Sequence, residues 1–349
     1  MPAPPTNVLA LLGPNRRDFL SLEGIGVGGS QSHDTSLVTG YANASMRMNT
    51  ANNSNGSRSI ALGGAYDHLI IAADCYRNGA NGVNTVWNYG IGFDLAASSN
   101  TFVLSAAGRD NANHQILSTG PTLRGTSGLA VVTGTWTRVM LAVRLHATLG
   151  YIRLYVGGWD NLITSFEGDT IAAVGTSTFD RALLIGNGQG RICNVVASST
   201  TPDTFALDRL RLWNAGVWLQ SPAAAGAVSQ QQSGTFADVN SVPISFASGV
   251  VMRNQREVSF RMAAPPATAK SALAAELFWS GTRESINIVN GVRLFLSDGP
   301  NRELSAVYPT PISTTWGDWL RTTSPSGSPL RLEDVSATNW QWGYKAGTP

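Results

Sequence analysis

Apolar and polar residues alternate along most of the chain. The clearest case runs from residue 138 to 146, where every second residue is apolar: Val139, Leu141, Val143 and Leu145. A period of two is typical of a β-strand with one face turned to a core. This pattern places Val143 inside the core and its neighbour Arg144 outside it.

The next apolar alternation, Ile152, Leu154 and Val156, ends at Gly157-Gly158. Both glycines can adopt positive φ, so the pair predicts a hairpin turn. Further strands are expected at His68–Arg77, Thr85–Leu95, Thr101–Ala107, Ala182–Gly186 and Phe205–Trp213. The last segment changes parity along its length, and a bulge near Asp208 would reconcile its two halves.

Signals for helices are scarce, because no 3.6-residue period extends beyond about two turns. Residues 222–234 are small, polar and without period, which is typical of a linker. Alternation returns after it at 257–262, 273–279 and 292–296. We therefore predict four segments: an N-terminal arm at 1–20, a large β-sandwich at 21–218, a linker at 219–234 and a smaller β-sandwich at 235–349.

Composition then excludes several classes of protein. The chain has 349 residues, 43% of them hydrophobic, and a formal net charge of +2. It is too apolar for a disordered protein and too evenly charged for a sequence-independent nucleic-acid binder. No apolar run approaches the length of a membrane span. All but two of the 24 basic residues are arginine, the exceptions being Lys270 and Lys345.

The cysteines and the N-terminus indicate whether the protein is exported from the cell. Cys75 and Cys193 lie in apolar or small-residue surroundings outside any CxxC motif, so buried free thiols are favoured over a metal or redox site. A disulfide between them stays open for an extracellular protein. The N-terminal apolar run is six residues long with no preceding charge, which does not fit a signal peptide. The arm could tether one subunit to another or be a loose end.

Motifs for catalysis are incomplete. A glycosidase needs two carboxylates at a suitable separation. The nearest match to an ExDxxE strand runs from Glu167 through Asp169 to Ala172, where alanine replaces the last acid. No histidine pair has metal-binding spacing, and no P-loop or nucleophile elbow occurs. We therefore expect no enzymatic activity, no catalytic residues and no cofactor.

A binding role has better candidates. Sugar binding needs an aromatic ring beside polar side chains. Trp159, followed by Asp160 and Asn161 at a hairpin tip, is the first candidate, and Trp87 with Tyr89 is the second. Packing in the core or at a subunit interface is the competing interpretation of each ring. Asp160 and Asp110 could also donate oxygens to Ca²⁺, although both residue types are common in turns.

Two resemblances add to this picture. Residues 61–218 resemble the concanavalin A-like, laminin G-like jelly-roll family, through WTRVMLAVRLH, GYIRLYVGGWD and FALDRLRLWN. This resemblance implies a jelly-roll sandwich that binds carbohydrate or protein. The C-terminal EVSFRMAAPPATAKSALAAELFWSG and LRLEDVSATNWQWGYKAG resemble the end of tailed-bacteriophage virion proteins.

The leading hypothesis is therefore a non-enzymatic structural protein of a phage or phage-like virion. It would be displayed on the capsid or tail as a decoration, spike or fibre-type component, with host glycan as a ligand. Its partners would be other virion proteins and further copies of itself, with a trimer as the expected assembly, and neither nucleic acid nor membrane. It would be synthesised in the host cytoplasm. Two alternatives remain open: a stand-alone bacterial carbohydrate-binding module or lectin, and a glycan-cleaving enzyme.

Overall fold

The computed structural model describes part of the chain in detail. The described residues are 7–12, 32–34, 36, 39, 45–49, 56–79, 87–96, 104–109, 113–118, 123–217, 222–231, 234–235, 237, 256–281, 291–298, 300–309, 315–336 and 341–346. The chain folds into two compact units, Asn7–Trp218 and Leu219–Pro349.

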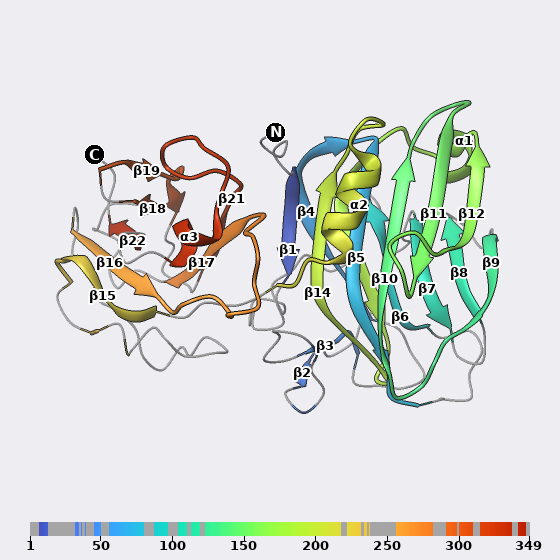
Figure 1. The fold of residues 1–349 in the computed structure, drawn as a ribbon, viewed down its shortest axis with the longest axis horizontal. Coiled ribbons are helices and arrows are strands. Elements are labelled where there is room, and N and C mark those ends of the chain that lie inside the picture. The colour runs from blue at the N-terminus through green and yellow to red at the C-terminus, as the bar shows by residue number, and fades with distance from the viewer. Residues whose placement is uncertain are drawn as a thin grey trace. The chain divides into compact units, whose positions relative to one another are not determined.

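The first unit contains a large antiparallel sheet (Figure 1). Its strands follow the order β12-β11-β10-β5-β14-β3-β2, and β1 also pairs with β14. Their bounds are β1 Val8–Leu12, β2 Ser32–Asp34, β3 Ser45–Arg47, β5 His68–Arg77, β10 Trp136–Arg144, β11 Gly150–Val156, β12 Leu162–Gly168 and β14 Gly190–Ser199. The strand predicted at His68–Arg77 is confirmed over its whole length.

A second antiparallel sheet of six strands completes this unit. The order is β4-β13-β6-β7-β8-β9. The bounds are β4 Gly56–Tyr66, β6 Trp87–Asp94, β7 Leu104–Arg109, β8 Asn113–Ser118, β9 Leu123–Ala130 and β13 Phe179–Gly186. The strands predicted at Thr85–Leu95, Thr101–Ala107 and Ala182–Gly186 thus exist with shifted ends.

One apolar core joins the two sheets. The alternating residues of β10 and β11, such as Val143 and Ile152, pack in one cluster with Ile91 and Phe93 of β6. The rings of Phe93 and Phe179 stack with centroids 5.6 Å apart. Because residues of both sheets share this cluster, the unit is a two-sheet antiparallel β-sandwich, and the predicted all-β fold class is confirmed.

Phe205–Trp213 corrects one prediction, because it forms the helix α2 and not a strand. Asp208 and Leu212, one helical turn apart, are the buried residues of α2. The Asp208 carboxylate accepts a hydrogen bond from the Thr200 hydroxyl at 2.8 Å. The change of parity that suggested a bulge is therefore the period of a helix. Figure 1 shows α2 lying across the face of the large sheet that is turned away from the core.

The guanidinium of Arg138 on β10 holds the C-terminal end of α2 against this face. It donates to the carbonyls of Leu212 and Ala215 at 2.7 and 2.8 Å. It also pairs with the Asp74 carboxylate of β5 at 3.1 Å. Carbonyls at a helix C-terminus lack partners within the helix, so a cation there stabilises both the carbonyls and the helix dipole.

Two segment assignments were wrong in part. Val8–Leu12, predicted to belong to an arm, is the strand β1 and pairs with β14. Pro222–Ser229, predicted to be linker, is the strand β15 and pairs with β16. Small residues such as those of β15 carry no apolar alternation, so their pairing leaves no period in the sequence. Residues 13–31 lie outside the described residues.

The second unit is also built from antiparallel strands. One sheet has the order β15-β16-β22-β18-β19, with β20 also on β18, and a two-stranded sheet joins β17 and β21. The bounds are β15 Pro222–Ser229, β16 Glu257–Met262, β17 Ala275–Gly281, β18 Gly291–Ser297, β19 Arg302–Leu304, β20 Tyr308–Pro309, β21 Thr315–Arg321 and β22 Gln341–Ala346, with the helix α3 at Leu332–Ser336. Its core gathers Leu294, Leu296, Leu330 and Trp342.

Both cysteines are buried free thiols, as predicted. Burial raises the pKa of each thiol. Among the described helices, none has the length and apolar character of a membrane span.

Candidate functional site

Strand β11 presents a row of polar aromatic and basic side chains on the outer face of the large sheet. Ile152, Leu154 and Val156 belong to the core. The residues between them therefore point outward, because side chains alternate along a strand. These outward residues are Tyr151, Arg153 and Tyr155. The two tyrosines are buried, at 8% and 3% exposed, and Arg153 is half-buried. From Tyr151 to Tyr155 the row extends roughly 13 Å.

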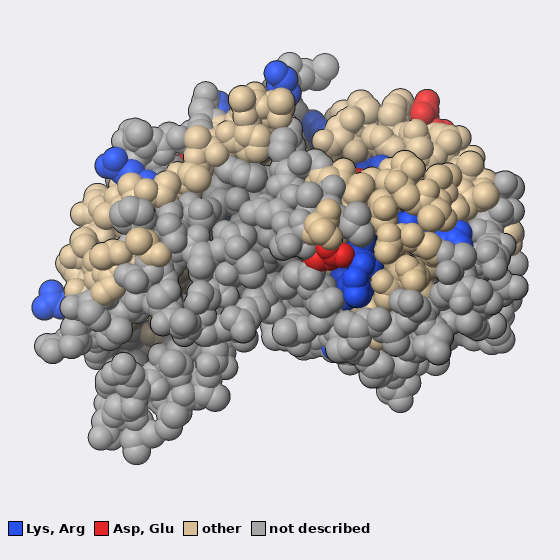
Figure 2. All heavy atoms as spheres, turned by 90° about the horizontal axis from the view of Figure 1, so that it is seen from below, with Lys and Arg blue, Asp and Glu red and all other residues tan. Residues whose placement is uncertain are grey.

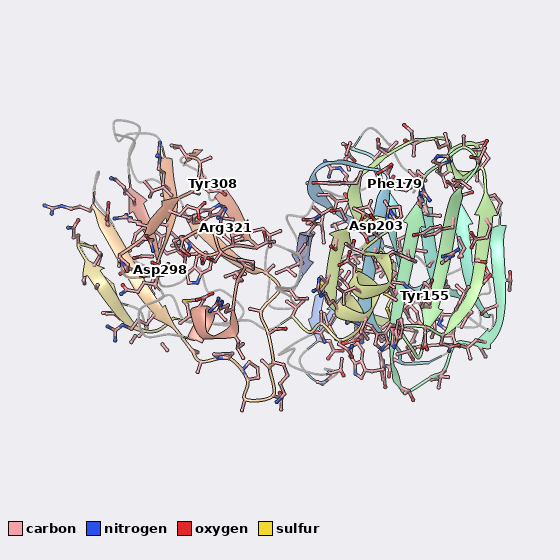
Figure 3. The ribbon with its side chains drawn as sticks, turned by 45° about the horizontal axis from the view of Figure 1, so that its top comes forward. Tyr155, Phe179, Asp203, Asp298, Tyr308 and Arg321 are labelled. Carbon is pink, nitrogen blue, oxygen red and sulfur yellow. The ribbon has the colours of Figure 1, made fainter. Side chains whose placement is uncertain are left out.

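Arg209 of α2 lies over the end of this row. Its guanidinium carbon is 4.6 Å from the ring centroid of Tyr155, 4.8 Å from that of Phe205 and 5.5 Å from that of Trp159. Its Nη1 donates to the Trp159 carbonyl at 3.2 Å. Three aromatic faces and one hydrogen bond thus fix the position of this cation. Figure 3 shows Tyr155 on the sheet beside α2.

Arg153 carries the second guanidinium of the row. It donates from Nε and Nη2 to the two carboxylate oxygens of Glu167 on β12, at 2.8 and 3.2 Å. It also lies 4.1 Å from the ring centroid of Tyr151. Burial raises the pKa of the Tyr155 hydroxyl, and the nearby charges of Arg209 and Arg153 oppose the rise.

At the other end of the row, Tyr151 meets His68 of β5. The Tyr151 hydroxyl and His68 Nε2 are 2.5 Å apart. Burial, and next the charge of Arg144, lowers the pKa of His68 to about 4. The imidazole is therefore neutral at neutral pH and adds no charge to the face. Phe205 packs against both rings, with centroids 5.6 Å from His68 and 5.2 Å from Tyr151.

Three arginines lie along this row. Arg144 of β10 lies in register with both His68 and Tyr151. Arg144, Arg153 and Arg209 thus surround the row, and Glu167 is the carboxylate that pairs with one of them. In the view of Figure 2, the described Lys and Arg side chains occur in small separate groups. We call Tyr151, Arg153, Tyr155, Trp159, Glu167 and Arg209 the β11 face.

The hairpin between β11 and β12 places the first predicted sugar-binding group beside this row. The turn is longer than Gly157-Gly158 alone and spans residues 157–161, with Gly157 at a φ of 77°. Trp159 is half-buried, whereas Asp160 and Asn161 are exposed. The Asn161 amide donates to the Val156 carbonyl at 2.7 Å and so closes the turn.

The second predicted sugar-binding group is not at this site. Tyr89 belongs to the core with only 2% of its surface exposed, and its hydroxyl is 3.0 Å from His114 Nε2. Tyr89 as a glycan-binding residue was therefore wrong, because its side chain does not reach solvent. The side chain of Trp87 lies outside the described residues.

The predicted acidic groups have structural partners. Asp169 caps the short helix α1, Thr170–Val174, by accepting from the Ala172 amide at 2.8 Å. Glu167 is bound to Arg153. Within the described parts of the chain, no cluster of three His, Cys, Asp or Glu side chains could hold a metal ion. Asp110, the second proposed calcium ligand, lies outside those parts.

The sequence indicated only part of the β11 face. Trp159 was found from its place at a hairpin tip, and the outward positions of Tyr151, Arg153 and Tyr155 were available from the alternation of β11. Arg209 was missed because its segment was assigned to a strand. No local signal relates α2 to β11, since that contact joins segments about 50 residues apart.

Comparison with known proteins finds similar structures but assigns the chain to no family. No family model matches the chain, and no curated protein matches it. A carbohydrate-binding module, CBM66 from Bacillus subtilis, has 12% identity and a TM-score of 0.35, over 51% of this chain and 94% of that one. Lectin II from Ulex europaeus has 8% identity and a TM-score of 0.35, over 49% and 92%. A Trypanosoma rangeli sialidase has 13% identity and a TM-score of 0.35, over 54% of this chain and 32% of the sialidase. These similar structures thus include binding proteins and an enzyme.

Proposed function

We propose that this protein is a carbohydrate-binding protein whose ligand lies on the β11 face. The observation that carries the proposal is the position of Trp159, a half-buried ring at a hairpin tip between the exposed Asp160 and Asn161 and the guanidinium of Arg209. An aromatic ring can cover the apolar face of a sugar, and flanking guanidinium, amide and carboxylate groups can bind its hydroxyls.

The partners of the two acidic residues favour binding over catalysis. A glycosidase needs one carboxyl group as an acid and a second as a base or nucleophile. Glu167 makes two hydrogen bonds to Arg153, and Asp169 caps α1. Display on a virion, trimeric assembly and synthesis in a host cytoplasm stay predictions from the sequence.

A glycan array followed by titration calorimetry tests the proposal. Trp159→Ala should weaken binding of the selected saccharide at least tenfold, which corresponds to about 1.4 kcal/mol. Trp319→Ala is a matched control, because Trp319 is also half-buried but belongs to the second unit, where its ring lies 6.3 Å from that of Trp342. Equal effects of the two substitutions, or no binding across the array, would overturn the proposal.

A further inference from the structure

We infer that the saccharide bound at the β11 face is acidic and that Arg209 binds its carboxylate. This inference rests on the proposed carbohydrate-binding function and specifies its ligand class.

Arg209 has no carboxylate partner among the described residues, in contrast to its neighbours. Arg211, on the same helix, lies 3.7 Å from Asp208, and Arg153 is paired with Glu167 at 2.8 Å. The contacts of Arg209 are three aromatic rings and the Trp159 carbonyl. Its buried Nε has no hydrogen-bond partner. These contacts orient the guanidinium without neutralising its charge.

The surroundings of Arg209 strengthen its attraction for an anion. Aromatic rings replace water on several sides of the guanidinium, and electrostatic interactions grow as the local dielectric falls. The hydrogen bond to Trp159 and the three rings also restrict the side chain before a ligand arrives. A group that is already positioned loses less conformational entropy on binding.

Two further guanidiniums, those of Arg144 and Arg153, lie near Arg209. The charges of Arg153, Arg144 and Arg209 all lower the pKa of the Tyr151 hydroxyl, which burial raises, so the three guanidiniums are close enough to act on one site. Glu167 compensates one of them. His68 is neutral at neutral pH. Of the two guanidiniums of the β11 face, that of Arg209 is therefore the one without a carboxylate partner among the described residues. Asp67 and Asp208 act on the adjacent His68 ring.

The geometry of the Arg209 guanidinium fits a carboxylate. A guanidinium and a carboxylate are both planar and match through two parallel hydrogen bonds. Arg153 and Glu167 display this pairing on the same face. A uronic or sialic acid residue whose ring packs on Trp159 would bring its carboxylate to the adjacent Arg209. The sugar ring and the acid would then bind to different side chains.

Separating these two contributions is the purpose of the experiment. The full chain is titrated with oligogalacturonate and with the same oligosaccharide after reduction of its carboxyl groups. We expect the acidic form to bind at least tenfold more tightly, with an advantage that shrinks as salt rises. Arg209→Gln should remove this advantage, and Arg209→Lys, which keeps the charge but loses the planar group, should retain part of it. Arg261→Gln, at an exposed position of the second unit, should change nothing.

Each outcome distinguishes the inference from the function on which it rests. Equal binding of both forms, lost in Trp159→Ala, would overturn the acidic ligand and leave carbohydrate binding supported. Binding of sulfated dextran but not of oligogalacturonate would overturn the carboxylate. Binding of no saccharide would overturn both proposals. A thermal melt of Arg209→Gln that matches the wild type shows that the lost preference does not arise from unfolding.

Discussion

The guanidinium of Arg153 and the carboxylate of Glu167 bind each other across adjacent strands through two hydrogen bonds of 2.8 and 3.2 Å. The strand register places Tyr151 opposite Glu167 and Arg153 opposite Ser165, so this pair is a diagonal one. Both side chains are partly exposed, at 31% for Arg153 and 49% for Glu167. On the β11 face, Glu167 therefore occupies the position that an acidic ligand of Arg153 would take.

Glu167→Gln should increase the affinity for an acidic saccharide. The substitution removes the internal competitor of the ligand, and an exposed ion pair is worth about 0.2–1 kcal/mol, so we expect an increase of roughly two- to fivefold. The unfolding free energy should fall by less than about 1 kcal/mol for the same reason. Titration calorimetry with oligogalacturonate and urea denaturation measure the two quantities. Weaker binding by Glu167→Gln would show instead that the carboxylate contacts the sugar directly.

His68 makes the stability of the first unit depend on pH. Its pKa is about 4 in the folded protein, because of burial and the charge of Arg144, against 6.5 for an ordinary histidine. Between these values the unfolded chain binds more protons than the folded one, so the free energy of unfolding decreases as the pH falls from about 6.5 to 4. The loss should approach about 3 kcal/mol at the low end of this window.

Urea denaturation at pH 7.5, 5.5 and 4.5 tests this prediction with His68→Gln as the comparison. Asp67 and Asp208 also act on the imidazole, and carboxylates contribute their own pH dependence below about pH 5. The informative quantity is therefore the difference between wild type and variant. That difference should shrink or change sign as the pH falls. Parallel curves for the two proteins would contradict the buried neutral imidazole.

Two neighbouring residues of β10 test which way this strand faces. Val143 has no exposed surface and lies in the core, whereas Arg144 points to the outer face. Val143→Asp places an unpaired charge in the core and should cost on the order of 3 kcal/mol or more. Arg144→Asp should cost less than about 1 kcal/mol. Thermal melts of the two variants measure this difference, and equal melting temperatures would refute the assignment.

Features that leave a local pattern in the sequence could be predicted, whereas contacts between distant segments could not. A strand with one buried face leaves a period of two, and this is why β5, β10 and β11 could be located. Apolar residues alternate in the same way at Tyr89, Ile91 and Phe93, and this alternation places Tyr89 in the core. The pattern therefore already contradicted a sugar-binding role for Tyr89. The contact of Arg209 with Trp159 depends on where α2 lies on the sheet, which no local pattern specifies.

The helix α2 shows why a short apolar pattern can be ambiguous. Phe205, Leu207, Leu210 and Leu212 fit a bulged strand with all four side chains on one face, and they also fit a helix. The bulged strand and the helix predict different exposure for these leucine side chains. In α2, Leu212 has no exposed surface and Leu207 is 40% exposed.

Substitution of these two leucines by glutamate distinguishes the alternatives. Leu212→Glu should destabilise the first unit by about 3 kcal/mol or more, because it buries a charge between α2 and the sheet. Leu207→Glu should change the unfolding free energy by no more than about 0.5 kcal/mol, because its side chain remains in water. Urea denaturation of both variants at pH 7.5 measures the difference. In a bulged strand both residues would face the core, so comparable losses would contradict the helix, and with it the position of Arg209 beside Trp159.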